Sequence, residues 1–367
     1  MSSRASAKTA SLPDLRERID EYNHKILKLL SERARLVLDV ARHKHLHGIA
    51  VYQPVREREV IDRMISANPG PLTPEHVARI YTEIISACRA LEQPLRVAFL
   101  GPEHTYSHQA AIANFGSSML YMPQPSFAEV FSSIENGRAE FGVVPVENST
   151  EGSINLTLDL LIDTTLVIVG EILLPIRHAL LSRAKHESDI RKIVSHQQSL
   201  AQCRNYLNQN FPGIETEAVA SNSMAARRAA EDPTVAAIAS IDAGRANDLN
   251  VFAENIQDLA QNTTRFLIMG THPTVRSGAD KTTVLFAVPD KVGALNQVLA
   301  LFARNKINIS KIESRPRRGR PWEYLFFVDF KGHREDAHTV RAIAGLGRIA
   351  LFLKVLGSYP EARTARA

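Results

Sequence analysis

The feature that most constrains this chain is a helical pattern near its start, from Ser11 to about His47. Apolar residues recur there in steps of four and three, the spacing of a helix that buries one face in a bundle. The residues of this seam are Leu15, Ile19, Tyr22, Ile26, Leu29, Leu36 and Val40. Arg33 interrupts the seam, and a cation among apolar side chains is costly unless it is paired. Arg33 therefore needs either a buried acidic partner or an anion bound inside the bundle.

Two other cations bear on this choice. Lys44 lies about three turns beyond Arg33 and returns to within about 20° of the same helix face. Arg16 lies roughly 25 Å from Arg33 along the helix axis, too far for both to hold one small molecule. Two antiparallel helices would bring the partner subunit's Arg16 to Arg33. The sequence thus suggests a homodimer with a shared anion site, and a surface helix with Arg33 paired to a buried Glu is the alternative.

Two shorter helical patterns follow. One begins at Pro54 and runs to about Ala67, and the other is capped by Thr73 and runs to about Glu92. A helix far longer than its two neighbours buries its seam poorly within one chain, which again indicates dimerisation. We expect an all-α three-helix domain at residues 11–93.

The character of the sequence changes after residue 94. Short apolar runs typical of strands alternate with helical stretches, which favours an α/β domain with a parallel or mixed sheet. The expected strands span residues 96–100, 141–146, 166–172, 192–195, 235–239 and 266–269. Residues 95–272 suffice for two small lobes, and a hinge would place a ligand cleft between them, at loops that leave strand ends.

A segment rich in Gly, Pro, Ser and Thr at residues 271–281 predicts a linker to a third domain. The pattern then reads strand, helix, strand, strand, helix, strand, over residues 282–288, 293–304, 308–314, 322–329, 336–344 and 349–355. This βαββαβ order predicts a ferredoxin-like α+β unit at residues 281–360. Such a unit often senses a small molecule when it is appended to an enzyme, although a fold does not prove a function.

Composition narrows the classes of protein to consider. Among 367 residues, 44% are apolar, and 44 basic against 39 acidic residues give a net charge of +5, too mild to favour nucleic acid or membrane partners. Cys88 and Cys203 cannot form a disulfide framework, and no metal-binding spacing is present. Without a secretory segment or a long apolar run, we expect a cytoplasmic protein. The densest basic cluster is interpreted as a solvated hairpin loop and comprises Arg315, Arg317, Arg318 and Arg320.

Motifs in all three domains resemble known families. The first domain resembles the all-helical chorismate mutases in Leu15-Arg16, Glu32-Arg33, Lys44, Pro54-Val55-Arg56-Glu57, Ser86-Ala87-Cys88 and Glu92. The middle resembles the prephenate dehydratases at residues 101–107, 145–149, 195–196, 202–203 and 262–266. The tail resembles phenylalanine-sensing ACT regulatory domains at residues 293–295 and 313–316. Because several motifs agree in order, the chain resembles the bifunctional chorismate mutase–prephenate dehydratase family from end to end.

The resemblance implies that the first domain rearranges chorismate to prephenate in one pericyclic step, without a nucleophile, a metal or a cofactor. Such a site holds a dicarboxylate in a compact pose and stabilises charge that develops on the ether oxygen. Arg33 and the partner subunit's Arg16 would bind the carboxylates as bidentate forks. Lys44 would donate to the ether oxygen, and Glu57 would accept the ring hydroxyl.

The implied mutase site departs from the family at three positions. Gln53 stands where Asp is frequent, so hydroxyl recognition next to the substrate-binding candidate Arg56 is expected to differ. Glu92 stands where Gln is frequent, and a carboxyl group must carry a proton to donate to the ether oxygen. Mutase activity would then fall as Glu92 loses that proton at higher pH. Cys88 replaces a common Ser or Thr and is interpreted as a small packing residue.

Prephenate dehydration expels the ring hydroxyl as carbon dioxide leaves, so it requires a proton donor to the departing oxygen. The resemblance assigns that role to Thr264, although threonine is a weak acid, and lets Arg265 hold a substrate carboxylate or brace the site. His104 stands where Gly is usual and cannot adopt a positive φ as cheaply, so its loop is expected to differ in shape. Gln197 stands where Pro is common. The other implied cleft residues are Asn148, Ser149, Ser195 and Gln202.

The tail is implied to bind phenylalanine as a feedback effector. Backbone N–H groups where the first helix of the tail opens would meet the amino acid's carboxylate. The bound effector would shift the dehydratase cleft toward a less active state by its differential affinity for the two states. The implied effector residues are Gly293, Ala294, Leu295, Glu313, Ser314, Arg315 and Pro316.

Two alternatives stay open at this stage. A dehydratase of this kind could prefer arogenate, the transaminated substrate, and no single residue decides between the two substrates. A non-catalytic phenylalanine-binding protein would also suit a two-lobed cleft with a sensor domain. The presence of Arg33, Lys44 and Thr264 argues against the second alternative.

Overall fold

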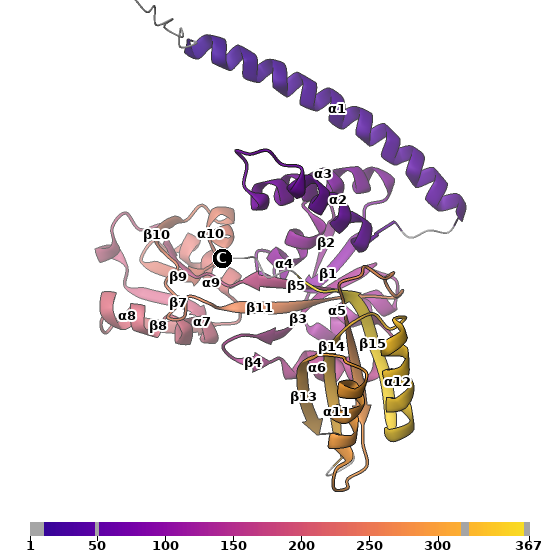
Figure 1. Cartoon of the computed structure of the whole chain (residues 1–367). Helices are drawn as coiled ribbons and strands as arrows, with labels where there is room; N and C mark the ends of the chain where they lie inside the picture. The colour runs from indigo at the N-terminus through magenta and orange to yellow at the C-terminus, as the bar shows by residue number, and fades with distance from the viewer. Residues whose placement is uncertain (1–10, 48–50, 317–322, 363–367) are drawn as a thin grey trace, which may run out of the picture.

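The computed structural model describes residues 11–47, 51–316 and 323–362 of the chain. These residues form a helical region, a middle region with two sheets and a C-terminal region with a third sheet (Figure 1). Of the predicted basic cluster, Arg315 lies within the described residues, whereas Arg317, Arg318 and Arg320 lie outside them. No helix in the described ranges is long and apolar enough to span a membrane.

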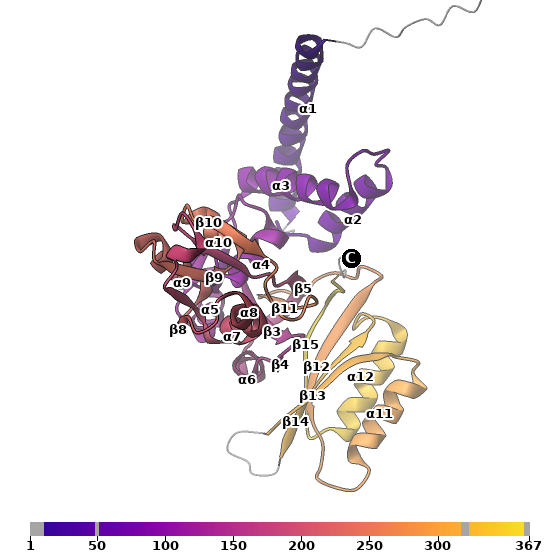
Figure 2. The same ribbon diagram turned by 90° about the vertical axis from the view of Figure 1, so that its left-hand side faces the viewer.

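The helical region consists of α1 (Leu12–His47), α2 (Pro54–Ser66) and α3 (Pro74–Glu92). α1 projects from the rest of the molecule, and Figures 1 and 2 show it separate from the two sheets of the middle region. None of the residues of α1 is buried. On its predicted seam, Leu29 is 64% exposed and Leu36 is 65% exposed. The predicted amphipathic helix is therefore present, but one chain does not cover its apolar face.

The first lobe of the middle region contains a mixed six-stranded sheet of order β2-β1-β3-β11-β5, with β4 paired to β3. β1 runs parallel to β2 and β3, whereas β11 runs antiparallel between β3 and β5. The strands are β1 (Arg96–Leu100), β2 (Leu120–Gln124), β3 (Phe141–Asn148), β4 (Gly152–Ser153), β5 (Val167–Pro175) and β11 (Thr263–Gly270). The helices are α4 (Tyr106–Phe115), α5 (Phe127–Glu135) and α6 (Asn155–Asp163).

The second lobe has a five-stranded sheet of order β10-β6-β9-β7-β8. The chain enters this lobe after β5 and returns to the first lobe before β11, so two crossings join the lobes. The strands are β6 (Ala179–Ser182), β7 (Lys192–His196), β8 (Glu215–Val219), β9 (Val235–Ala239) and β10 (Asn250–Glu254). The helices are η1 (Glu187–Asp189), α7 (Gln197–Gln202), α8 (Arg204–Asn210), α9 (Asn222–Glu231) and α10 (Ile241–Ala246).

The C-terminal region has the predicted βαββαβ order and a sheet of order β13-β14-β12-β15. Helices α11 and α12 lie together on one face of this sheet (Figure 2). The strand expected from residue 322 begins at Tyr324, and residue 322 lies outside the described residues. The elements are β12 (Asp280–Ala287), α11 (Ala294–Arg304), β13 (Ile309–Pro316), β14 (Tyr324–Lys331), α12 (Ala337–Ile349) and β15 (Phe352–Pro360).

The middle and C-terminal regions share one hydrophobic core. Val144 and Leu267 of the first lobe belong to the same buried cluster as Phe327 of the C-terminal sheet. β15 also approaches β5 closely, because a Cβ atom at Gly357 would lie 2.2 Å from the carbonyl oxygen of Ile168. Only glycine fits there.

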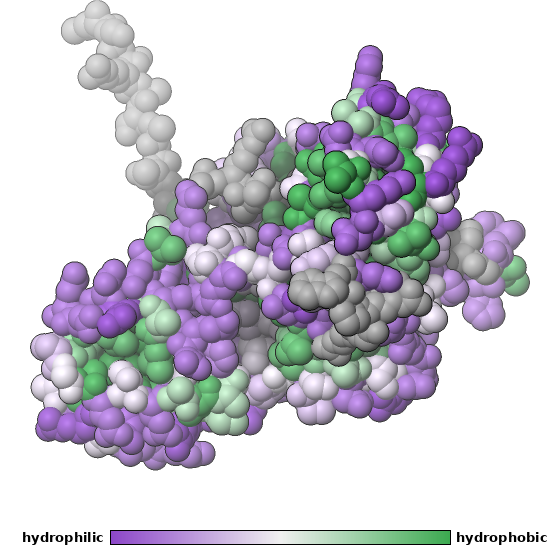
Figure 3. All heavy atoms as spheres, turned by 90° about the horizontal axis from the view of Figure 1, so that it is seen from below, coloured by the Kyte–Doolittle hydropathy of each residue, from purple (hydrophilic) through white to green (hydrophobic). Residues whose placement is uncertain are grey.

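The outer surface seen from below shows scattered hydrophobic patches among hydrophilic residues (Figure 3).

Candidate functional sites

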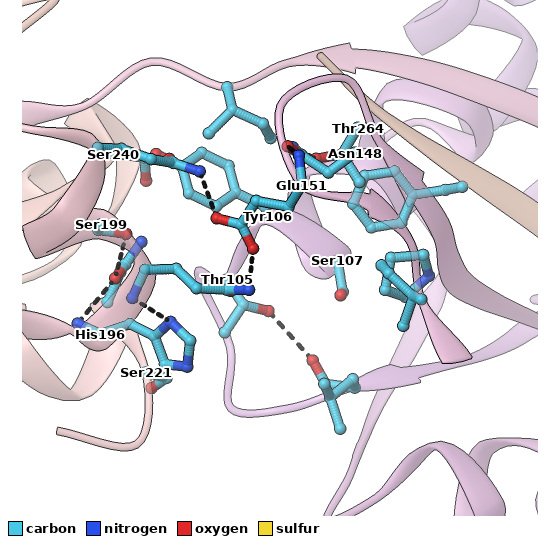
Figure 4. A pocket seen from close by; sticks show the side chains of 18 of the residues that line it. Thr105, Tyr106, Ser107, Asn148, Glu151, His196, Ser199, Ser221, Ser240 and Thr264 are labelled. Carbon is cyan, nitrogen blue, oxygen red and sulfur yellow. Dashed lines mark hydrogen bonds between the residues drawn. The ribbon is translucent and has the colours of Figure 1, made fainter. Parts of the chain in front are cut away.

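A cavity of about 680 Å³ lies between the two lobes of the middle region (Figure 4). Its lining includes the N-termini of α4 and α9, whose cap residues are Thr105 and Ser221. Each cap side chain accepts a hydrogen bond from a backbone N–H of its own first turn. Helix N-termini carry a partial positive charge. The predicted interlobe cleft therefore exists and favours an anionic ligand.

Thr264 lines this cavity near the start of β11 and is 8% exposed. Its hydroxyl oxygen accepts a hydrogen bond from Asn148 Nδ2 at 2.8 Å, and the same amide donates to Asn262 Oδ1 at 2.8 Å. Asn148 Oδ1 in turn accepts the backbone N–H of Thr150 at 3.0 Å, so the amide is held by the turn after β3. Because Thr264 accepts this bond, its own proton is available to a ligand in the cleft.

Gln202, on α7 of the second lobe, extends this polar chain across the cleft. Its Oε1 atom accepts from Asn262 Nδ2 at 3.0 Å and lies 3.0 Å from His178 Nε2. Burial lowers the pKa of His178, against a smaller opposing effect of the Gln202 bond. A neutral ring that donates to Gln202 presents Nδ1 as an acceptor, and the hydroxyl of Tyr106 lies 2.9 Å from it.

Glu151 is a cleft residue that the sequence did not predict, and its contacts cross the cavity. It lies on the β3–β4 turn of the first lobe, and its carboxylate faces two amides of α7 across the cavity (Figure 4). Gln202 Nε2 donates to Glu151 Oε1 at 2.8 Å, and Gln198 Nε2 donates to Oε2. Glu151 lies two residues after the motif at 145–149, which was the available signal. Other lining residues absent from the prediction are Tyr106, His178, Ser199 and Ser221.

Two of the predicted cleft residues support the cleft from outside it. Ser149 donates to the carbonyl of Gln261 at 3.2 Å and accepts the N–H of Thr263 at 3.0 Å, which fastens β3 to β11. Ser195 is fully buried, and its hydroxyl lies 2.6 Å from the carbonyl oxygen of Ile238 and 3.0 Å from an oxygen of the lining residue Asn222. Both serines therefore bond to protein groups rather than face the cavity.

Arg265 follows Thr264 on β11 and points toward the C-terminal region, as alternation along a strand requires. Its guanidinium donates to Glu171 at 2.7 Å, to Asp329 at 2.5 Å and to the hydroxyl of Tyr359 at 3.0 Å. The sequence allowed either a carboxylate ligand or a brace. The observed position is that of a brace between two domains.

The loop before α4 corrects one expectation. His104 adopts a φ of 64°, the left-handed conformation that a glycine would take there. Its backbone N–H donates to His108 Nδ1 at 3.0 Å, which helps to hold this conformation. Thr105 then caps α4 in the ordinary way, and Gln197 is the first residue of α7. The two departures from the family pattern, His104 and Gln197, are thus compatible with the starts of α4 and α7.

Five predicted mutase residues gather where α1 meets α3 and α2. Arg33 Nη1 contacts Cys88 Sγ at 2.9 Å, so its partner in this chain is a thiol rather than the buried Glu of the alternative interpretation. Lys44 Nζ donates to Glu92 at 3.2 Å and to the carbonyl of Val51 at 3.1 Å. Lys44 bonds to only one oxygen of the Glu92 carboxyl, Oε2, so donation from this group to the ether oxygen stays a prediction.

The remaining mutase candidates differ in their surroundings. Burial raises the pKa of Glu57, the fifth gathered residue, against the opposing positive charges of Arg89 and Lys44. Arg56 is half exposed and pairs with Glu59 at 3.1 Å. Gln53 caps α2 without a side-chain hydrogen bond. Arg16 is exposed near the opposite end of α1 and is not brought to this group within one chain.

The predicted effector residues lie at two places in the C-terminal region. Gly293 caps α11 with a φ of 79°, which places Ala294 and Leu295 in the first turn. On β13, Glu313 accepts from the hydroxyl of Ser153 at 2.7 Å, and Arg315 donates to Asp159 at 2.8 Å. Ser153 lines the interlobe cavity. Ser314 and Pro316 lie on the same strand. Among the described residues, no group of His, Cys, Asp and Glu side chains could hold a metal ion.

Three family profiles match successive parts of the chain. The profile described as chorismate mutase type II matches residues 15–93. The profile described as prephenate dehydratase matches residues 97–274, and that of the ACT domain matches residues 282–348. Their order is the order of the three regions in the structure.

Known proteins are similar over nearly the whole chain. The bifunctional chorismate mutase/prephenate dehydratase of Aquifex aeolicus is 42% identical over 96% of this chain and 98% of its own length. That of Pseudomonas aeruginosa is 44% identical over 96% and 98%. The solved structure of an Arthrobacter aurescens prephenate dehydratase in complex with L-Phe has a TM-score of 0.68 and 35% identity, over 73% of this chain and 90% of that chain. This chain therefore belongs to the family of bifunctional chorismate mutase/prephenate dehydratases.

Proposed function

We propose that the chain rearranges chorismate to prephenate and then converts prephenate to phenylpyruvate, with feedback inhibition by phenylalanine. The observation that carries this proposal is the interlobe cavity, which is lined by Thr264 and by two helix N-termini. Prephenate is a dianion, and such N-termini favour negative charge. The polar chain from Thr264 through Asn148 and Asn262 to Gln202 joins both lobes, so closure of the lobes would order these groups around the substrate.

In the dehydration, the ring carboxylate leaves as carbon dioxide and its electron pair enters the ring. The carbon–oxygen bond to the ring hydroxyl breaks, and the departing oxygen takes a proton and leaves as water. Thr264 supplies a hydrogen-bond donor at that oxygen, because its own oxygen is already held as an acceptor by Asn148. Aromatisation of the ring supplies the driving force, so a weak acid in a fixed position suffices.

The mutase reaction would use Arg33, Lys44 and Glu57. They already lie in one group, and Arg33 faces the thiol of Cys88 rather than a carboxylate. A second carboxylate ligand is needed, and Arg16 lies far along the same helix. We propose a homodimer in which the partner subunit's Arg16 completes the site. The exposed seam of α1 supports this, because apolar area of that extent is stabilised when a second copy covers it.

Feedback would act through the strand that carries Glu313 and Arg315. Both side chains bond to the dehydratase domain, at Ser153 and Asp159. Phenylalanine bound at these residues and at the N-terminus of α11 would compete with such contacts. The β3–β4 turn next to Ser153 carries Glu151 in the cleft. Loss of the contacts of Glu313 and Arg315 to phenylalanine would therefore alter the dehydratase site.

The test follows chorismate loss and phenylpyruvate formation by the purified chain, with and without phenylalanine. We expect phenylpyruvate to form and to decrease when phenylalanine is added. Thr264→Val should abolish phenylpyruvate but leave chorismate loss intact, and Arg33→Met should do the reverse when prephenate is supplied. Thr263→Val, one position away on β11, is the matched control. Rates measured separately with prephenate and with arogenate decide which substrate the dehydratase prefers. A wild-type chain that binds phenylalanine but has neither activity would support the alternative of a non-catalytic phenylalanine-binding protein.

A further inference from the structure

One buried cation beside the mutase group is not part of the family motifs quoted above. Arg89 follows Cys88 on α3 and is 4% exposed. Its Nη1 atom lies 3.2 and 3.4 Å from the two carboxylate oxygens of Glu57. Its Nη2 atom donates to the carbonyl of Phe115 at 2.8 Å. One guanidinium therefore bonds to the mutase domain on one side and to the dehydratase domain on the other.

The surroundings fix the orientation of this guanidinium. Its central carbon lies 5.2 Å from the ring centre of Tyr52 and 5.8 Å from that of Phe115, and these ring centres lie 5.0 Å from each other, so the guanidinium packs against an aromatic pair. Tyr52 is itself held by Asn114 of α4, which donates to its hydroxyl at 2.9 Å. A guanidinium bonded through both terminal nitrogens and packed against two rings has little freedom to rotate.

The charge and the orientation of the Glu57 carboxyl group depend on the position of Arg89. This carboxyl group accepts the ring hydroxyl of a substrate more strongly as a carboxylate, yet burial disfavours that charged form. The titratable groups that face it are Arg89 from α3, Lys44 from α1 and Tyr52 before α2. Lys44 is shared with Glu92. Arg89 is thus the cation that bonds to Glu57 directly.

We propose that Arg89 is a positioning residue of the mutase reaction, which holds Glu57 ionised and oriented through a contact anchored in the dehydratase domain. This inference rests on the mutase activity proposed above. It implies that the mutase site is completed by the second domain, because Phe115 ends α4. The opposite end of α4 begins with Tyr106 and Ser107, which line the dehydratase cleft. One helix therefore contacts both sites.

The test measures kcat/KM for chorismate against pH in the full chain. Arg89→Met should lower it at least about tenfold at neutral pH, the effect of losing one hydrogen bond to a charged group. The acid limb of the profile should move to higher pH, because removing the neighbouring cation raises the pKa of Glu57 further. Arg89→Lys keeps the charge, so it should restore the position of the limb but only part of the rate.

Three controls separate positioning from folding. Arg79→Met, at an exposed position of the same helix, should leave the profile unchanged. Dehydratase activity on supplied prephenate, measured in the same preparations, should stay within about twofold of wild type, a change of under ~0.5 kcal/mol in the barrier. Glu57→Gln should remove the acid limb, and the double variant with Arg89→Met should lose little more than Glu57→Gln alone.

Two results would overturn the inference on an active wild-type background. One is a wild-type pH profile in Arg89→Met. The other is an equal loss of both activities in Arg89→Met and Arg89→Lys, which indicates a purely structural role. A wild-type chain that leaves chorismate intact while it dehydrates prephenate shows instead that the proposed mutase function fails.

Discussion

The first helix and the junction between the dehydratase and ACT domains handle apolar surface in opposite ways. Along α1 the seam is open to solvent, with Leu29 at 64% exposure and Leu36 at 65%. At the junction, Phe327 and Leu356 are at most 4% exposed and pack in one core with residues of the dehydratase domain. Both regions depend on the burial of apolar area. One chain supplies that burial at the junction but not along α1.

The cations of the two regions show the same contrast. Arg265, at the junction, bonds to two carboxylates and a tyrosine hydroxyl of its own chain. Arg33, on α1, contacts the sulfur of Cys88. A buried cation neutralised within its own chain serves the fold. A cation that faces a thiol keeps its charge for a ligand, which is the property a dicarboxylate site requires.

The largest expected effect comes from placing a charge on the open seam. Leu29→Glu should abolish mutase activity and convert a dimer to a monomer, because a second copy would have to bury the new carboxylate. Dehydratase activity on prephenate should persist. Sedimentation velocity and the two assays measure this. Asn23→Glu, off the seam, is the control, and identical behaviour of the two variants would show that no second chain covers the helix.

The next effect concerns the junction. Arg265→Met leaves Glu171 and Asp329 buried without their shared cation, which should cost about 3–5 kcal/mol in free energy of unfolding. Lys281 still bonds to Glu171 at 2.8 Å, so we expect the lower part of that range. Urea unfolding followed by circular dichroism measures the loss. Arg245→Met, whose side chain is 79% exposed, should change little; equal stability of the two variants would contradict the assigned brace.

The smallest effect is expected at the half-exposed pair of Arg96 and Glu140. Burial alone would raise the pKa of Glu140, but hydrogen bonds from Arg96 outweigh it and hold that pKa below its usual value. The pair therefore stabilises the fold above the ordinary pKa of 4.5, and this contribution is lost as the pH falls through the lowered value.

Glu140→Gln should accordingly reduce stability at pH ~7 by less than about 1 kcal/mol, because solvent screens the pair. The difference between variant and wild type should close at acidic pH. Thermal unfolding across this range measures it. A difference that grows toward low pH would contradict the assigned direction.

Local patterns predicted much of the fold, because periodicity and capping depend on neighbouring residues. The seam of α1 and the six apolar strands of the middle region are examples. Three of the missed strands, β2, β8 and β10, are the edges of their sheets. Edge strands carry polar residues or proline, as at Pro123 and Glu215, and so lack an apolar run. β6 is buried but has only four residues and none that is β-branched.

Site residues could be predicted from the sequence only where they belong to a motif that resembles a known family. Thr264 and Asn148 were found by resemblance, and the structure brings them within hydrogen-bond distance. Glu151 and Arg89 form hydrogen bonds across the boundaries between lobes and between domains, and no local pattern predicts such contacts. Ser195 and Arg265 show the converse case. Each lies in a motif, but their strands turn these side chains toward the protein interior.

The glycine at position 357 lets the backbone of the ACT sheet lie directly against the backbone of the dehydratase sheet. Since no side chain separates β15 from Ile168, a shift of the ACT sheet would press directly on β5. β5 pairs with β11, where Leu174 lies opposite Thr264. Thr264 is thus linked to the ACT sheet by one backbone contact and one pair of hydrogen-bonded strands, a connection that contains no side chain able to repack.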